Sequence, residues 1–279
     1  MRTPQLELIR EQKLYRLIPG RTMTSRLEAS GVALLDDSTA LVVFDSLNQI
    51  AHIDISLKPS RRNRIWHAPS LGAGFEDVAA DHKGGSTFAL VEAVEDFDGA
   101  LRGFVAEYDR DGRLRHCSRL PGSFKKANKG FEGLAHVRHN GREHLYALRE
   151  GNVRSRGCID VYVRGAKGGW RQSRQIELPD EARFDDYSAL AYRDGRLAVV
   201  SQESARLWVG QLDRRTHRLM PKSGAVYRFP HKRYRNVEGI DWLSADTVIA
   251  VSDRSKKDQP ARSADTDQSI HVFRIPQTT

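Results

Sequence analysis

The sequence lacks the features that would place it in a membrane or in an oxidising compartment. Over its 279 residues, no apolar run approaches the roughly 20 residues that span a bilayer. Charges at Glu7 and Arg10 interrupt the first residues, which contain no apolar signal core, so we expect a cytoplasmic protein without a membrane partner. Only two cysteines are present, Cys117 and Cys158, and neither belongs to a CxxC or Cys/His cluster. We expect two reduced thiols in or near strands.

Familiar catalytic and nucleotide-binding motifs are missing as well. The sequence contains no GxGxxG, GxxxxGK[ST], HExxH or GxSxG pattern. Residues 123–126 (SFKK) fit the SxxK pattern, but the companion motifs are absent. The lack of clustered cysteine and histidine also argues against structural zinc. Function must therefore be inferred from the organisation of the chain.

What the sequence does contain is a five-fold repeat. Three segments are near copies of one another, and each precedes a short apolar run: 74–80 (GFEDVAA), 130–136 (GFEGLAH) and 236–242 (NVEGIDW). Two weaker copies lie at 29–33 (ASGVA) and 186–191 (DYSALA). The anchor residues of the five units are Ser30, Glu76, Glu132, Ser188 and Glu238, and by subtraction they lie 46, 56, 56 and 50 residues apart.

Repeats of this length that contain several short strands are typical of propeller blades. Asn140-Gly141 and Asp194-Gly195 occupy the same place in their units, and both pairs favour a tight hairpin turn. The last unit ends one strand short, and an isolated apolar segment at 13–18 can complete it. The sequence predicts an all-β, five-bladed β-propeller closed by this N-terminal strand, with 1–279 as a single domain. A six-bladed ring, with the first 28 residues in a degenerate blade, is the alternative.

In a propeller, the start of the first strand and the end of the second strand of each blade lie on one face. This geometry predicts two rings of side chains around one channel mouth. The strand-start ring contains the five anchors. The strand-end ring consists of Asp45, Glu92, Glu150, Gln202 and Asp253. Seven of these ten positions are carboxylates, which would repel one another unless a cation lay between them.

A bound divalent cation would relieve this repulsion. Oxygen ligands of this kind suit Ca²⁺, with Mg²⁺ or Mn²⁺ as alternatives. We expect Glu76, Glu132 and Glu238 to be the ligands, with Asp45, Glu150 and Asp253 as further or alternative ligands. The alternative is that the acids only accept hydrogen bonds from turn amides of neighbouring blades.

Basic residues flank the same segments and form the second signal. They belong to four loops: Lys125, Lys126 and Lys129; Arg154 and Arg156; His231, Lys232, Arg233 and Arg235; Arg254, Lys256 and Lys257. Cations around an acidic centre would attract a phosphate or carboxylate ligand, although an ordinary solvated basic face is the alternative. In a hydrolytic site, Glu150 or Glu92 would act as the base. Lys126, Arg235 or Arg254 would then hold the developing anion.

Three segments resemble the "EGLA…VVSDES" signature of the SdiA-regulated and esterase-like phytase propeller families: 132–135 (EGLA), 238–241 (EGID) and 200–204 (VSQES). The repeat is more distantly similar to gluconolactonase-type calcium propellers. This resemblance implies a β-propeller, often with calcium in the channel, in a class that includes hydrolases. The chain departs from the pattern in having five units where gluconolactonases have six, and in having Gln202 where Asp is usual. No catalytic assignment therefore transfers from the resemblance.

Two functional hypotheses follow. The first is a metal-dependent hydrolase of a small anionic ester, phosphoester or lactone, which the formal net charge of +9 favours. The second is a non-catalytic scaffold that binds a ligand or a protein partner across this face. Nucleic acid is a less favoured partner, because the basic residues surround acids instead of forming a continuous track with stacking aromatics.

Overall fold

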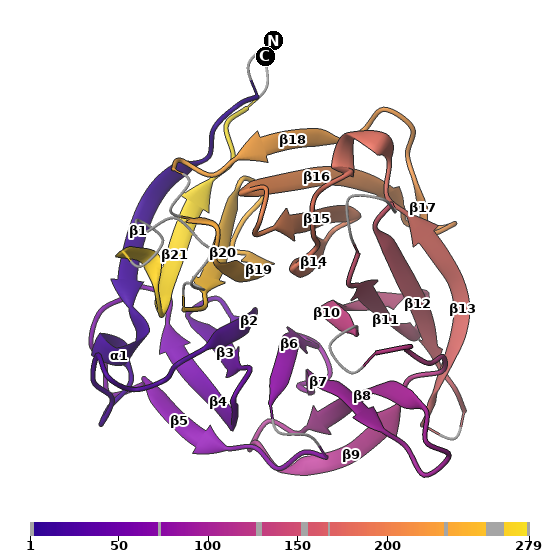
Figure 1. Cartoon of the computed structure of the whole chain (residues 1–279), viewed down its shortest axis with the longest axis horizontal. Helices are drawn as coiled ribbons and strands as arrows, with labels where there is room; N and C mark the ends of the chain where they lie inside the picture. Colours follow the sequence, from indigo (N-terminus) through magenta and orange to yellow (C-terminus); the bar gives the residue numbers. More distant parts are fainter. Residues whose placement is uncertain are drawn as a thin grey trace.

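The computed structural model describes residues 3–71, 74–126, 130–151, 156–166, 168–231, 234–254 and 265–277, except for the side chain of Glu92. Strands dominate, and the described helical elements are one turn of α-helix, α1 (Leu14–Leu17), and the 3-10 turn η1 (Asp180–Ala182). The strands form five small sheets arranged in a ring (Figure 1). The predicted five-bladed, all-β propeller is confirmed.

Each blade is an antiparallel meander whose first strand lies nearest the centre of the ring (Figure 1). Blade one contains β2 (Ala29–Asp36), β3 (Thr39–Phe44), β4 (Leu47–Asp54) and β5 (Arg64–His67). Blade two contains β6 (Phe75–Ala80), β7 (Thr87–Glu95), β8 (Leu101–Tyr108) and β9 (Leu114–Arg119). Blade three contains β10 (Phe131–His139), β11 (Arg142–Arg149), β12 (Cys158–Arg164) and β13 (Trp170–Glu177).

The last two blades differ in their outer strands. Blade four contains β14 (Ala189–Arg193), β15 (Arg196–Ser201) and β16 (Arg206–Asp213), and both β17 (Arg218–Leu219) and β18 (Ala225–Arg228) pair with β16. Blade five contains β19 (Val237–Trp242), β20 (Thr247–Ser252) and β21 (Ser269–Arg274). Its fourth strand is β1 (Glu7–Lys13), which pairs antiparallel with β21 and closes the ring.

Closure by the N-terminus is confirmed, but the predicted segment was wrong. The closing strand ends at Lys13, and most of the predicted strand 13–18 is instead the helix α1. Leu14 and Leu17 are three residues apart, so in a helix both can face the apolar cluster beneath them, where both are buried. The outer strand β1 exposes most of its polar side chains, which is why it shows no clear apolar pattern.

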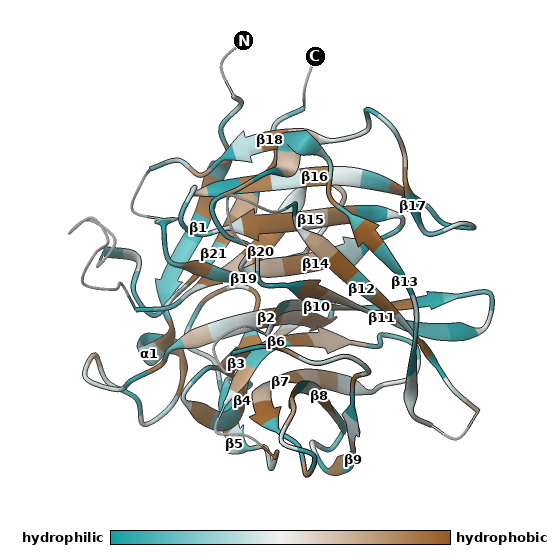
Figure 2. Cartoon of the chain, turned by 45° about the vertical axis from the view of Figure 1, so that its right-hand side comes forward, coloured by the Kyte–Doolittle hydropathy of each residue, from teal (hydrophilic) through white to brown (hydrophobic). Residues whose placement is uncertain are grey.

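The hydrophobic core is divided into five apolar clusters, each lying between two neighbouring blades. The second and third strands of the blades supply much of it through runs such as 248–251 (VIAV), in which every residue is buried on both sheet faces. Figure 2 shows apolar residues concentrated on these second and third strands. Trp208 and Trp242 are fully buried in the clusters, as expected for core aromatics.

The inner strands approach one another closely, and glycine permits this. A Cβ on Gly239 would lie 2.8 Å from the Cα of Gly31, and a Cβ on Gly31 would lie 2.5 Å from Oδ1 of Asp77. A Cβ on Gly133 would lie 2.7 Å from the backbone nitrogen of Leu190. These residues, one position after their anchors, form a narrow waist in the channel. We call the end of the channel next to the anchors the strand-start mouth and the other end the hairpin-end mouth.

Several local predictions are also confirmed. Both residues of Asn140-Gly141 and of Asp194-Gly195 have positive φ values, as a type I′ hairpin turn requires. Cys117 in β9 and Cys158 in β12 are free thiols.

Among the described residues, no helix has the length and apolarity needed to cross a membrane.

Candidate functional site

The predicted metal ligands occupy a repeated irregularity of the inner strands. The ladder between the first and second strands skips one residue at Ser30, Glu76, Glu132 and Glu238, so each of these anchors is the extra residue of a β-bulge. A bulge leaves its residue outside the ladder and redirects the side chain. In the fourth blade, Ser188 lies immediately before β14. The three glutamates are half-buried.

The strand-end ring lies at the same end of the blades. The backbone amide of Asp45 bonds to the carbonyl of Glu28, that of Glu150 to Gly130 and that of Asp253 to Asn236, in each case just before an inner strand. Asp253 is buried and Asp45 is exposed. Glu92 lies inside β7, which continues to Glu95, and its side chain is not among the described ones.

The predicted cationic rim can be followed only in part. Lys126 and Arg254 are exposed and Arg235 is half-buried. In the sequence, all three lie close to residues of the strand-start mouth. Other members of the rim lie outside the described residues: Lys129, Arg154, Lys232, Arg233, Lys256 and Lys257. The catalytic roles of Glu150, Glu92, Lys126, Arg235 and Arg254 stay predictions.

The two serine anchors bond neighbouring blades together. The hydroxyl of Ser30 donates to the carbonyl of Phe75, the residue before the anchor of blade two. The hydroxyl of Ser188 donates to the carbonyl of Val237, the corresponding residue of blade five, at 3.0 Å. An anchor can therefore serve a purely structural purpose when its side chain is short. The longer side chains of Glu76, Glu132 and Glu238 stand at the bulges of the other three blades.

Sequence analysis missed Asp77, which closes the channel beneath the strand-start mouth. It occupies the waist position held by glycine in three other blades, and it is 1% exposed. Its carboxylate accepts bonds from the backbone amides of Leu134 at 2.7 Å and Val78 at 2.8 Å. Burial raises the pKa of Asp77 well above its usual range, and the charges of Asp241 and Glu132 add to the increase. The sequence signal that could have identified Asp77 was an Asp at the position where three other repeats have Gly.

Beyond the waist lies a cavity of about 230 Å³ that opens at the hairpin-end mouth. Its floor consists of apolar side chains from the five inner strands: Val32, Val78, Leu134, Leu190 and Ile240. Asp241 lines the wall and accepts bonds from the amides of Leu34 at 2.6 Å and Trp242 at 2.7 Å. Although part of Asp241 faces the cavity, desolvation raises its pKa to about 6.

The rim of this cavity carries a cluster that sequence analysis also missed. Asp81, His136 and Glu143 can each direct one ligand atom to a common point, with these atoms within 4.8 Å of one another. Nδ1 of His136 lies 3.9 Å from Asp81, and its Nε2 lies 3.8 Å from Glu143. In the described part of the chain, this is the only such group of three. The ligand atoms of Glu76, Glu132 and Glu238 are thus not gathered this closely.

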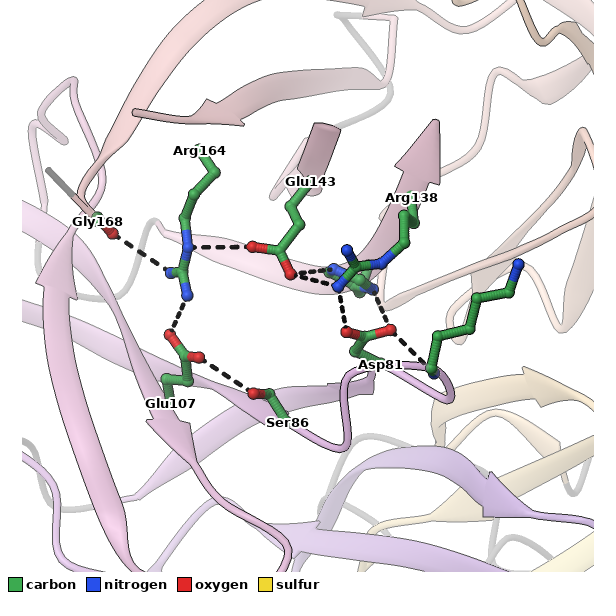
Figure 3. Close-up of polar contacts among 9 residues, drawn as sticks. Asp81, Ser86, Glu107, Arg138, Glu143, Arg164 and Gly168 are labelled. Carbon is green, nitrogen blue, oxygen red and sulfur yellow. Dashed lines mark hydrogen bonds and ion pairs between the residues drawn. The ribbon is translucent and has the colours of Figure 1, made fainter. Parts of the chain in front are cut away.

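Arginines already balance the charge of the cluster (Figure 3). Nη2 of Arg138 lies between Asp81, at 2.6 Å, and Glu143, at 2.7 Å. Arg164 continues the chain of alternating charges, at 3.1 Å from Glu143 and 2.6 Å from Glu107. The guanidinium of Arg138 therefore lies where a shared cation would be expected.

The pKa values of the two acids reflect these contacts. Burial acts to raise the pKa of Asp81, but the hydrogen bond from Arg138, backbone amides and the charge of His136 together hold it below its usual value. The close approach of His136 is the largest influence on Glu143, and together with the charges of Arg164 and Arg138 it lowers the pKa of that carboxyl despite burial. Both acids are stabilised as carboxylates, the form that binds cations. Asp81 and Glu143 come together only through the contact between blades two and three. No sequence pattern therefore predicted that they lie close to each other.

Comparison with known proteins supports the fold. No protein-family model matches the sequence, and neither does any curated protein. The chain is structurally similar to glutaminyl cyclase from Myxococcus xanthus, with a TM-score of 0.60 and 10% identity over 99% of this chain and 100% of that one. It is also similar to a luciferin-regenerating enzyme, with a TM-score of 0.52 and 14% identity over 96% of this chain and 95% of that one.

A third similar structure is the PQQ-bound form of an aldose sugar dehydrogenase from Streptomyces coelicolor. The TM-score is 0.50, with 15% identity over 95% of this chain and 98% of that one. This chain has a β-propeller fold. At such low identity the likenesses extend no further than the fold, and the resemblance to the SdiA-regulated and phytase-like families still depends on the sequence motifs alone.

Proposed function

We propose that the protein binds a divalent cation at the strand-start mouth through Glu76, Glu132 and Glu238 and hydrolyses a small anionic ester, phosphoester or lactone there. One observation carries the proposal. The inner strands of four blades are bulged at the anchor residue, and three of these bulges present a glutamate. Bulges of this kind occur next to active sites, where they redirect a side chain.

The donor set fits a cation that prefers oxygen. Carboxylates suit Ca²⁺, which takes six to eight oxygen ligands at about 2.3–2.6 Å, with Mg²⁺ or Mn²⁺ as alternatives. Because the three glutamates do not bring their ligand atoms within 4.8 Å of one another, binding requires these side chains to close on the ion. Glutamate has three side-chain torsions, so the carboxylates can move without displacing the inner strands.

The residues around the mouth would divide the chemistry. When bound, the cation would polarise the scissile group and lower the pKa of a coordinated water. Glu150 would accept a proton from the attacking water, since it lies in the strand-end ring beside Gly130. Arg235 and Arg254 would hold the anionic part of the substrate. The buried Asp77 would keep the channel closed below, so that substrate approaches from one side.

The direct test is thermal unfolding of metal-stripped protein with Ca²⁺, Mg²⁺ or Mn²⁺. A cation that binds only the folded state at a hundredfold excess over its Kd should raise the Tm by roughly 5 °C or more. The shift should vanish in Glu132→Gln and Glu238→Gln, and turnover of phosphoesters or lactones should vanish with it. Glu143→Gln, at the other mouth, is the matched control and should keep both.

The cluster of Asp81, His136 and Glu143 supports a second candidate site, because its ligand atoms are already close together. Its histidine would favour Zn²⁺ or Mn²⁺ over Ca²⁺, and Arg138 would have to withdraw. The same variants separate the two sites. If the rise in Tm on adding metal is lost only in Glu143→Gln, the cation binds at the hairpin-end mouth. No shift with any cation would favour the non-catalytic scaffold.

A further inference from the structure

A third region stands apart from both mouths of the channel. It is a recess of about 450 Å³ between blades three and four, where the β10–β11 turn, β13 and the β16–β17 turn meet. Figure 1 places β13 and β17 side by side at this position. Seven of the lining side chains are basic or imidazole groups: His139, Arg142, His144, Arg171, Arg174, Arg215 and His217. Among the described residues that line it there is no carboxylate. We call it the basic recess.

We propose that the basic recess binds a small multiply charged phosphoanion, such as a pyrophosphate or phosphate monoester group. The inference is independent of the cation site proposed above. Its first support is uncompensated charge. Among the described residues, the side chains of Arg142, Arg171 and Arg215 make no ion pair or hydrogen bond, although Asp213 lies near enough to Arg215 to interact with its charge. The side chain of Arg174 donates to the carbonyl of Thr216.

Other arginines in this protein behave differently. Nη2 of Arg149 lies 2.6 Å from Asp160, and Nη2 of Arg164 lies 2.6 Å from Glu107. The chain therefore pairs the guanidinium groups that line its blades where a carboxylate is in reach. Four arginines gathered without an ion-pair partner form a strongly cationic surface, whose charge Asp213 offsets only in part. Guanidinium groups match the oxygens of phosphate in a bidentate geometry.

The second support is the histidine group on the inner side of the recess. The ring of His217 lies 4.7 Å from that of His144 and 5.3 Å from that of His139, measured between centroids. Burial lowers the pKa of His217 to about 4, and the neighbouring charges of His144, His139 and Arg174 contribute. Nε2 of His139 is buried and has no hydrogen-bond partner among the described residues.

The third support is that the ring of His217 is held in position. Nδ1 of His217 contacts the hydroxyl of Tyr146, and burial raises the pKa of that tyrosine, so the hydroxyl stays protonated. In the tautomer in which this hydroxyl donates to Nδ1, the neutral ring carries its proton on Nε2. The amide of His217 bonds to the carbonyl of Asp213 at 2.8 Å, and that of Thr216 bonds to the Asp213 carboxylate at 2.7 Å. These bonds fix the turn that presents the ring.

The lining also limits the class of ligand. The remaining lining residues are Val161, Val163, Asn140 and Ser173, so the lining that the structure describes contains no Trp, Phe or Tyr. Single-stranded nucleic acid is usually bound on aromatic platforms, and this surface offers none. The volume suits a phosphate or pyrophosphate group with a small substituent. The chemistry therefore favours a small phosphoanion over a polynucleotide.

The test is calorimetric titration of the full chain with sodium pyrophosphate, in metal-stripped buffer at constant ionic strength. We expect saturable binding to the wild type and at least tenfold weaker binding to Arg142→Gln/Arg215→Gln, because both side chains are exposed and their loss should leave the fold intact. The matched control Arg61→Gln/Arg62→Gln removes two exposed arginines from blade one and should bind like the wild type. Glu132→Gln should also bind normally, since it belongs to the strand-start mouth.

Three outcomes would overturn the proposal. One is the absence of saturable heat with folded protein, verified by circular dichroism. Another is an equal loss of affinity in both double-arginine variants, which would mean that net charge alone attracts the anion. The third is binding of an oligonucleotide through the recess without binding of pyrophosphate or inorganic phosphate. Chloride at matched ionic strength supplies the baseline for each titration.

Discussion

Asp77 accepts a hydrogen bond of 2.7 Å from the backbone amide of Leu134, which joins the inner strand of blade two to that of blade three. Asp241 does the same for blades five and one, through the amide of Leu34 at 2.6 Å. Together with Ser30 and Ser188, these side chains bridge four of the five junctions of the inner ring. Polar side chains, and not only apolar packing, therefore set how closely the inner strands approach.

The first prediction concerns the narrow waist. Gly239→Ala would place a Cβ 2.8 Å from the Cα of Gly31, where only backbone movement can relieve the clash. We expect a loss of about 2–3 kcal/mol in the free energy of unfolding, typical of overpacking at a tight contact. Urea unfolding measures it. Gly169→Ala is the control, because nothing lies within 4 Å of its Cβ position, and it should change stability by less than about 0.5 kcal/mol. Equal effects would show that the inner strands can spread freely.

A second prediction follows from the pKa of Asp241, which burial raises to about 6. As pH rises, the unfolded chain releases this proton near pH 4, whereas the folded protein keeps it until about pH 6. The folded state is thus penalised across that interval, and the free energy of unfolding contributed by this site falls by about 3 kcal/mol and then levels off. Asp241→Asn cannot ionise, so the difference in stability between wild type and variant should change between pH 4 and 6. A difference that is constant with pH would contradict it.

The repeat made the fold predictable, because an anchor residue followed by short apolar strands recurs five times at intervals of 46 to 56 residues, and two units share a hairpin-turn signal. The N-terminal strand was misplaced because an outer strand such as β1 buries few side chains. Its pattern of charges therefore resembles a loop. Leu14 and Leu17 resemble strand residues in sequence, but their three-residue spacing suits the turn of helix that covers the junction of blades five and one.

The candidate sites were only partly predictable. The strand-start mouth followed from the repeat, since equivalent positions in equivalent blades must lie on one face. His136 belongs to the repeat motif, but its partners Asp81 and Glu143 come from a neighbouring blade and from the next strand. The basic recess joins β13 to the β16–β17 turn. Both sites depend on contacts between neighbouring blades, and the sequence of a single repeat does not specify such contacts.

A third prediction tests the charge network at the hairpin-end mouth. Arg164→Gln leaves the buried carboxylate of Glu107 without the guanidinium 2.6 Å away. It also removes the positive charge that lies 3.1 Å from Glu143. We expect a loss of about 2–4 kcal/mol, because removing one member of a buried pair leaves the other charge desolvated. Arg274→Gln breaks an exposed ion pair with Glu7 and should cost less than about 0.5 kcal/mol.

A double variant separates charge from packing at this position, since Arg164 also lies over the ring of Trp170 at 4.8 Å. If the unpaired carboxylate is the cause, Glu107→Gln should restore much of the stability lost in Arg164→Gln. If the two losses simply add, the packing of the arginine stem on Trp170 is responsible and the network contributes little. Urea unfolding of the four proteins in the cycle gives the coupling energy.

The last prediction is the pH dependence of pyrophosphate binding in the basic recess. His217 is uncharged at neutral pH, since burial lowers its pKa to about 4 and the charges of His144, His139 and Arg174 oppose protonation, against a smaller opposite effect of Asp213. A bound phosphoanion reverses the sign of the local field and favours the protonated ring. Protonation of His217 should therefore be coupled to binding, so that between pH 7 and 5 the wild type takes up more protons on binding than a variant that lacks this ring.

Titration in two buffers with different ionisation enthalpies measures this proton uptake directly. In His217→Gln, which keeps a hydrogen-bond donor but cannot titrate, uptake should decrease and the affinity should vary less with pH. The tyrosine that contacts His217 stays protonated throughout this range, and Arg142, Arg171, Arg174 and Arg215 remain charged. Residual proton exchange then comes from His139, from His144 or from the pyrophosphate itself, which titrates in this range. Proton uptake unchanged in the variant would place the titrating group elsewhere and remove His217 from the binding surface.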